Sequence, residues 1–305
     1  MRWLIGFVVL QLLIVPAARA EDVWNVLSDS EKATLDKVLA QWETWMPAKK
    51  ADGTAPLVTF EDLYKGLSPE ESGFLDRVRK INPKESFNFQ GEYLGESREG
   101  FRMRQIEGQQ VTKNGNKETL APQYLPVEVF QAYDKMMAAM NQDLGRHLLV
   151  ESGYRSPAYQ LYTYLFYMPK HNYSLVETGH WVALPGYSEH GAPQLQAIDF
   201  INPYGVNGED RVEDFEELPE YAWLQKHAGE YDFELSYPRD KPGITYEPWH
   251  WRYTGYSKVA PVGAEDIAES SGEAVAAPPA DAAAAAPAEA AVTPPAETPA
   301  PAPSA

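Results

Sequence analysis

The stretch YEPWHWRYTG, residues 246–255, decides how this chain is interpreted. It places Glu247 three residues before His250 and puts a tryptophan on each side of that histidine. Successive side chains of a β-strand point to opposite faces, so both tryptophans would pack on one face while His250 points to the other. Pro248 cannot donate a hydrogen bond to a neighbouring strand, which predicts an irregular backbone there that lets Glu247 bend toward His250. The stretch predicts a strand with an aromatic pair on one side and a reactive site on the other.

Two further stretches supply groups of the same chemical kind. They are SGYRSPAYQ, residues 152–160, and PGYSEHGAPQLQAIDF, residues 185–200. His190 lies in a loop rich in Gly and Pro, and Asp199 lies within an apolar strand, where a carboxylate is costly to bury unless it is paired or bound to a metal. A catalytic zinc usually takes three protein ligands from His, Asp and Glu and keeps a fourth position for water. We therefore predict a zinc site made by His190, Asp199 and His250.

Glu247 completes this chemistry. Zinc lowers the pKa of a bound water to about 7, and a carboxylate beside that water can accept its proton. A positioned base of this kind typically contributes about 10²–10⁴-fold in rate. The other four histidines receive no site role, although His180, ten residues before His190, is the first substitute for a ligand.

Composition excludes several classes of function. The 305 residues are 44% hydrophobic with eight Trp, which is enough for a packed core. The chain has no Cys, so disulfides, thiolate ligands and a cysteine nucleophile are all absent. Its net charge is −18 and no Lys/Arg cluster occurs, so we expect no nucleic-acid partner and no attraction to anionic membranes.

The two ends differ in character from the rest. Residues 1–20 combine a basic Arg2, a short apolar run and a small-x-small site, which predicts a signal peptide, export to the periplasm or cell wall, and no stable membrane span after cleavage. Residues 263–305 contain 18 Ala, 8 Pro and seven acidic but no basic side chains. We expect a disordered acidic tail there, because little of it can pack.

Between the ends, helices precede most strands without strict alternation, which favours an α+β fold. We predict a helical N-terminal extension over 21–124 and a catalytic domain over 125–260. Capping patterns and apolar periodicity predict the helices, and short apolar runs predict the strands. The expected helices span 28–46, 126–143, 156–168 and about 219–229, and a further helix begins at 68. The expected strands are 148–152, 196–201, 233–237 and 249–255.

In this order the three stretches resemble the VanY-type D-alanyl-D-alanine carboxypeptidases, which belong to a wider group of zinc peptidases with the hedgehog/DD-peptidase fold. The resemblance covers about residues 125–258, and EPWHWRYTG is its most specific part. It implies a small antiparallel sheet flanked by helices, a Zn²⁺ cofactor, and peptidoglycan stem peptides ending in D-Ala as substrate. Alternatives are a D,D-dipeptidase, a peptidoglycan endopeptidase, or a non-catalytic cell-wall binding protein on the same fold.

The resemblance also implies roles for single residues. It implies the zinc ligands His190, Asp199 and His250 and the base Glu247, and it makes Arg155 the residue that holds substrate and helps stabilise the transition state. Gln160 and Ser188 stand where relatives bind the terminal carboxylate of the substrate. One departure concerns the eight residues GAPQLQAI between the first histidine and the aspartate, where the family usually has six. A two-residue insertion in a loop costs little closure entropy, so both ligands could still reach one metal.

Overall fold

The computed structural model describes residues 25–258 apart from 88, 90, 98–101, 114, 210 and 242–244. The predicted signal peptide and the predicted acidic tail lie outside the described residues. Within the described part of the chain, no helix combines the length and the apolar character needed to span a bilayer.

A four-stranded antiparallel sheet forms the centre of the predicted catalytic domain, in the order β5-β6-β8-β7. The two inner strands, β6 and β8, are paired so that Asp199 lies opposite His250. This small sheet flanked by helices confirms the predicted α+β class. The strands are β5 (Leu149–Ser152), β6 (Ala197–Ile201), β7 (Phe233–Leu235) and β8 (His250–Tyr253).

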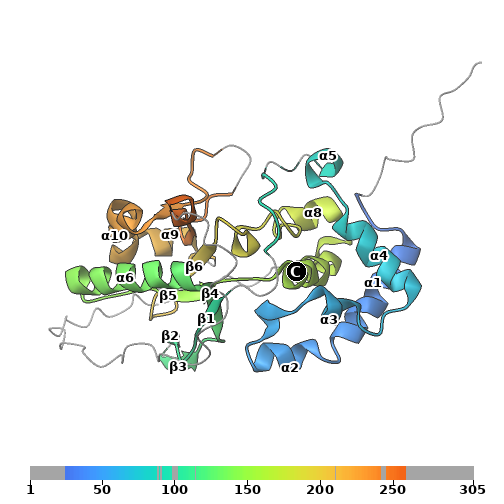
Figure 1. The fold of residues 1–305 in the computed structure, drawn as a ribbon, viewed down its shortest axis with the longest axis horizontal. Helices are drawn as coiled ribbons and strands as arrows, with labels where there is room; N and C mark the ends of the chain where they lie inside the picture. Colours follow the sequence, from blue (N-terminus) through green and yellow to red (C-terminus); the bar gives the residue numbers. More distant parts are fainter. Residues whose placement is uncertain are drawn as a thin grey trace, which may run out of the picture.

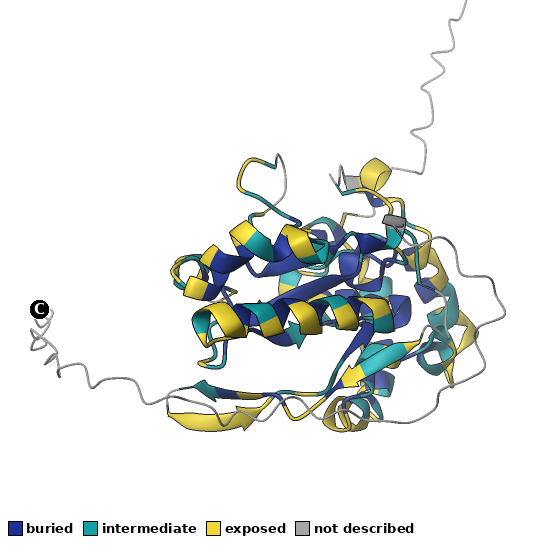
Figure 2. Ribbon diagram, turned by 60° about the vertical axis from the view of Figure 1, so that its left-hand side comes forward, coloured by how far each residue is buried: buried dark blue, intermediate teal, exposed yellow. Residues whose placement is uncertain are grey.

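One face of this sheet is buried against helices α6 (Val127–Leu144) and α10 (Pro219–His227). Trp249 and Trp251 both lie in this core, as strand alternation predicted, and they are 8% and 3% exposed. Figure 2 shows the dark, buried strands behind α6, whose outward face is exposed. The aromatic pair therefore fixes β8 on the core and leaves its other face to the site.

The N-terminal helices begin where the capping patterns predicted. Ser28 caps α1 and Ser68 caps α4, each in a complete capping box with the glutamate three residues later. The first helix ends at Trp42, earlier than the predicted 46, and α2 follows with Pro47 in its first turn. The short α5 was not predicted. These helices are α1 (Asp29–Trp42), α2 (Met46–Ala51), α3 (Phe60–Tyr64), α4 (Pro69–Arg79) and α5 (Pro83–Phe87).

These helices share a second hydrophobic core with α7 (Pro157–Tyr167) and α8 (Leu175–Gly179). Trp42 lies at its centre, 1% exposed, with its indole N–H donating to the Leu63 carbonyl at 2.9 Å. Figure 1 shows α1 to α4, in blue, gathered at one end of the molecule around α7, with α6 and α10 at the other. This core therefore crosses the predicted division at residue 124, because α7 belongs to the predicted catalytic domain.

Two further antiparallel strand pairs are β1 with β4 and β2 with β3. The remaining elements are β1 (Met103–Ile106), β2 (Gln110–Lys113), β3 (Asn116–Thr119), β4 (Gln123–Pro126), α9 (Val212–Glu216) and the short 3-10 helices η1 (Ala55–Leu57), η2 (Met168–His171), η3 (Glu189–Gly191), η4 (Ala228–Tyr231) and η5 (Gly255–Lys258).

Candidate metal centre and active site

The two inner strands place an aspartate and a histidine in direct contact. Asp199 on β6 and His250 at the start of β8 are register partners, and both side chains are buried. His250 Nδ1 lies 2.8 Å from Asp199 Oδ1. Sheet pairing therefore fixes this half of the site without help from loops.

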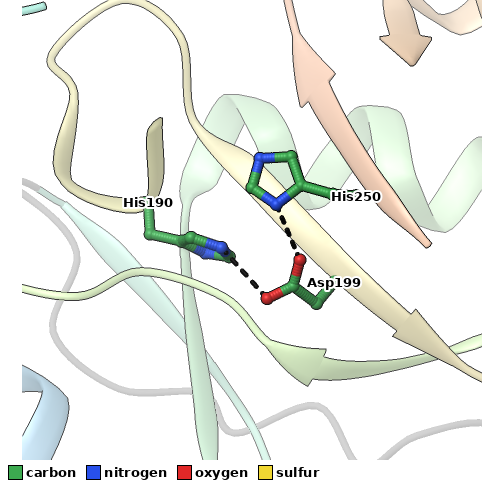
Figure 3. A group of neighbouring side chains, drawn as sticks. All are labelled: His190, Asp199 and His250. Atoms are coloured by element: carbon green, nitrogen blue, oxygen red, sulfur yellow. Dashed lines mark hydrogen bonds and ion pairs between the residues drawn. The ribbon is translucent and has the colours of Figure 1, made fainter. Parts of the chain in front are cut away.

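The other histidine comes from the short helix η3, which precedes β6. His190 Nε2 lies 3.0 Å from the second carboxylate oxygen, Asp199 Oδ2. Gly191 lets η3 pack closely against the backbone of Arg155, since a Cβ at residue 191 would stand 2.6 Å from the Arg155 carbonyl oxygen. Figure 3 shows both imidazoles converging on the aspartate, and one ligand atom from each of the three residues lies within 4.8 Å of the others.

The three side chains present a donor set that suits a zinc ion. Nδ1 of His190 lies 2.7 Å from the Gly153 carbonyl oxygen, an acceptor, so this nitrogen carries the proton and Nε2 offers its lone pair. That Nε2 is buried and lies 3.0 Å from Asp199 Oδ2, but among the described residues it makes no hydrogen bond of acceptable geometry. On the other ring, Nε2 of His250 faces Glu189 and Nδ1 faces the aspartate. Metal-bound histidines commonly have their outer nitrogen anchored in this way.

The charges around Asp199 stabilise its ionised form. Burial alone would raise its pKa, but the two histidines hold the pKa of this carboxyl well below its usual range. Burial alone would lower the pKa of His250, whereas its contacts with Asp199 and Glu189 raise that pKa to about 10. Burial and the nearby Arg155 charge lower the pKa of His190. The Asp199 carboxyl is therefore ionised, which is the form that binds a cation.

Glu247 lies at the edge of this group. Its Oε2 is 3.7 Å from His250 Nδ1, and its side chain is 30% exposed. Residues 248–249 form a turn in which the His250 amide donates to the Glu247 carbonyl at 3.2 Å, so the backbone is irregular there, as predicted. Burial raises the pKa of this carboxyl to about 7, with His250 opposing the shift. A carboxyl with that pKa can take up and release a proton near neutral pH.

The predicted substrate residues lie just before α7, within α7 and at the cap of η3. The Arg155 amide donates to the His190 carbonyl at 3.0 Å, and its buried Nε has no hydrogen-bond partner among the described residues. Gln160 is buried and uses one N–H to reach the Ala183 carbonyl at 2.7 Å, while its Oε1 is unpartnered in the described part of the chain. Ser188 caps η3 by accepting from the His190 amide at 3.4 Å. Arg155 therefore lies beside the centre, whereas Gln160 and Ser188 also have structural contacts.

Three side chains near the centre were not singled out from the sequence. Glu189 lies 3.1 Å from His250 Nε2 and also contacts Arg252. The Tyr237 ring packs 4.6 Å from the His250 ring, and burial raises the pKa of this phenol well above its usual value. The glutamate stands next to His190 in the SEH motif, which was the available signal. By contrast, His180 is exposed and pairs with Glu177 at 3.8 Å, away from the three candidate ligands.

The inserted loop after His190 does not separate the ligands. It runs beside the end of β8, where the Tyr253 amide donates to the Gln196 carbonyl at 2.8 Å. Segment 92–97 from the N-terminal part crosses this region through two backbone bonds, Leu94 to the Gly186 carbonyl and Ser97 to the Gly191 carbonyl. An open cavity of about 460 Å³ lies here, lined by Leu94, Pro193, Gln194, Leu195 and Thr254. The insertion thus borders a hollow next to the site.

Together, an α+β domain and a buried His/Asp/His group with an adjacent carboxylate make a candidate metal centre with the ligand types of a catalytic zinc site. Residues 122–256 match the sequence model of the VanY family, described as D-alanyl-D-alanine carboxypeptidase. The resemblance to the VanY-type carboxypeptidases that the motifs predicted is therefore confirmed over residues 122–256.

Among curated relatives, the chain is 32% identical over 136 residues to a D-alanyl-D-alanine carboxypeptidase of Enterococcus faecium, covering 43% of this chain and 38% of that protein. It is 29% identical over 143 residues to the bifunctional D-Ala-D-Ala dipeptidase and D-Ala-D-Ala carboxypeptidase VanXYC of Enterococcus gallinarum, covering 43% and 68%. Among solved structures it is similar to the LdcB LD-carboxypeptidase, with 26% identity, a TM-score of 0.39 and coverage of 50% of this chain and 71% of that one. The chain therefore spans well under half of the Enterococcus faecium relative.

Proposed function

We propose that this protein is an exported, zinc-dependent D-alanyl-D-alanine carboxypeptidase that removes the terminal D-Ala from peptidoglycan stem peptides. The observation that carries the proposal is the buried group of His190, Asp199 and His250 with Glu247 at its edge. The match of residues 122–256 to the VanY family model supports the reaction class. The predicted signal peptide and the action of the family on cell-wall peptides support export.

The three buried side chains would hold the zinc ion through His190 Nε2, His250 Nδ1 and a carboxylate oxygen of Asp199. A zinc ion held there would act as a Lewis acid and lower the pKa of water to about 7. Glu247, beside His250, would accept the proton of the attacking water and return it to the leaving amine of D-Ala. Its pKa of about 7 suits both steps near neutral pH.

Arg155 would bind the carboxylate of the substrate. Its guanidinium offers a planar pair of N–H donors that match a carboxylate, and the buried Nε is free of any hydrogen-bond partner among the described residues. Its charge also acts on both His190 and Glu247, so it lies near the reacting groups. Gln160 and Ser188 would add further polar contacts to this carboxylate from either side.

A D,D-dipeptidase on the same fold is the second candidate, because the similar VanXYC protein is described as bifunctional. A carboxypeptidase releases one D-Ala from a longer stem peptide, whereas a dipeptidase cleaves free D-Ala-D-Ala. An endopeptidase cuts within cross-linked peptides and needs no free carboxylate, and a non-catalytic binding protein cuts nothing. The products therefore distinguish all four functions.

The zinc-loaded full chain should be incubated with a pentapeptide stem ending in D-Ala-D-Ala, with free D-Ala-D-Ala and with cross-linked muropeptides, and the products weighed by mass spectrometry. We expect one D-Ala from the pentapeptide and little cleavage of the other two. The His250→Ala variant serves as the control without activity. Preferential cleavage of the free dipeptide would replace the proposal with the dipeptidase, and cleavage of cross-links alone would replace it with the endopeptidase.

A further inference from the structure

Glu189 is a buried carboxylate that bridges a predicted metal ligand and an arginine. Its side chain is 4% exposed. One oxygen, Oε2, lies 3.1 Å from His250 Nε2, and the other, Oε1, lies 2.9 Å from Arg252 Nη1. Both carboxylate oxygens are therefore engaged by nitrogen donors.

The first contact fixes which nitrogen of His250 is available to a metal. A carboxylate only accepts hydrogen bonds, so the proton of this pair belongs to His250 Nε2. Nδ1 faces the Asp199 carboxylate at 2.8 Å and by the same reasoning carries a proton in the metal-free protein. A cation bound beside Asp199 would take the place of this Nδ1 proton, while Nε2 keeps its own proton in the bond to Glu189. With the opposite tautomer, the lone pair would point at Glu189 and away from the other ligands.

The second contact connects the two segments that carry the histidines. Glu189 directly precedes His190 in η3, whereas Arg252 and His250 both lie on β8. Residues 250 and 252 of a strand point to the same face, so Glu189 is held at two points on the face that carries the site. Arg252 is oriented in turn by Glu234 on β7, which accepts from Arg252 Nε at 2.7 Å. These bonds set the position of His190 relative to His250.

We propose that Glu189 and Arg252 form a positioning clamp that holds His250 in its metal-binding tautomer and holds η3 against β8. This inference rests on the zinc centre of the proposed function. Neither residue needs to touch the substrate, because the clamp acts through the two histidines. Removing one partner of a buried ion pair also destabilises the fold, so zinc affinity and the His250 proton, rather than folding stability, are the readouts specific to the clamp.

The test compares Glu189→Gln with Glu234→Gln in the full chain. Glu189→Gln keeps the size of the side chain but removes the charge that both His250 and Arg252 contact. Glu234→Gln is the matched control, since it also removes a carboxylate partner of Arg252, but one on an exposed side chain. The zinc dissociation constant of each protein is measured by competition with a chromophoric chelator. We expect about 10–100-fold weaker binding for Glu189→Gln and a change within about twofold for the control.

A second readout follows the proton itself. In ¹⁵N-labelled zinc-loaded wild-type protein, His250 should give a downfield Nε2–H proton signal that exchanges slowly with water. In Glu189→Gln this signal should move upfield and exchange faster. A loss of packing alone would not move the signal in a variant whose circular dichroism spectrum matches the wild type. The wild-type signal decides the matter by itself if the variant fails to fold.

Two results would overturn the clamp while leaving the proposed function intact. These are equal zinc affinity of Glu189→Gln and wild type, or a zinc-loaded wild type without a proton on His250 Nε2. A wild-type chain that takes up no zinc at all would instead overturn both the clamp and the proposed zinc centre.

Discussion

Replacing Trp42 with alanine tests whether the N-terminal helices are part of the catalytic unit. Trp42 is 1% exposed in the core that α1 shares with α7, and its ring centroid lies 5.7 Å from that of Tyr162. Replacing a fully buried Trp with Ala typically costs 3–5 kcal/mol. The change also leaves the Leu63 carbonyl without its indole donor. We therefore expect a loss of about 3–5 kcal/mol, a large share of a typical domain's 5–15 kcal/mol.

This loss should reach the metal centre. Ser156, next to Arg155, is tied to the N-terminal part through its amide, which donates to the Pro56 carbonyl at 2.8 Å, and through its hydroxyl, which donates to the Val58 carbonyl. Arg155 in turn donates its amide to His190. These contacts form one continuous path from the N-terminal core to His190. When that core unfolds, we therefore expect the zinc to be released in the same unfolding transition.

The assay is urea unfolding of the full chain, followed in parallel by far-UV circular dichroism and by release of zinc to an indicator dye. Both midpoints should fall together in Trp42→Ala. Trp181→Ala is the matched control, because Trp181 is 75% exposed and its loss should change stability by less than about 0.5 kcal/mol. A loss below about 1 kcal/mol in Trp42→Ala, or an unchanged midpoint for zinc release, would refute the reasoning.

Three further predictions concern the site. Glu247→Gln should keep zinc and fold but lower kcat by about 10² or more, measured as D-Ala release; near-normal turnover would remove Glu247 from the mechanism. Amidating the terminal carboxylate of the peptide should lower kcat/KM at least about tenfold, and Arg155→Lys should lower it on the free peptide too; equal hydrolysis of amidated and free peptides would contradict a carboxypeptidase. Burial raises the pKa of Glu151 to about 7, so the folded state binds more protons than the unfolded state between pH 4.5 and 7, and stability falls as pH rises through that window. Glu151→Gln should remove up to about 3 kcal/mol of this fall between pH 5 and 8 in urea unfolding; an identical pH profile in variant and wild type would contradict the assignment.

Local patterns in the sequence predicted much of the fold. Capping boxes at Ser28 and Ser68 marked the starts of α1 and α4. Alternation in 249–252 correctly placed both tryptophans in the core. These features depend on residues close in the sequence, which is why they could be predicted. The strand register that puts Asp199 opposite His250 was not predictable, since it depends on segments about fifty residues apart.

The same reason explains what the sequence did not reveal about the site. The three candidate ligands could be predicted because each stands in a distinctive motif. The sequence marks Glu189 only by its place next to His190, and its contacts appear only when η3 packs on β8 and the side chain meets Arg252. Likewise, residues 92–97 look like an ordinary polar loop, and only the fold brings Ser97 to the loop that carries His190.

The most direct test of the central claim is a zinc titration of chelator-stripped full-length protein, with release of D-Ala from a peptide ending in D-Ala-D-Ala as the readout. The account predicts no release without metal, a rise that saturates at about one zinc per chain, and no recovery in His250→Ala at the same zinc concentration. Undiminished D-Ala release from metal-free protein, or full activity in His250→Ala, would contradict it.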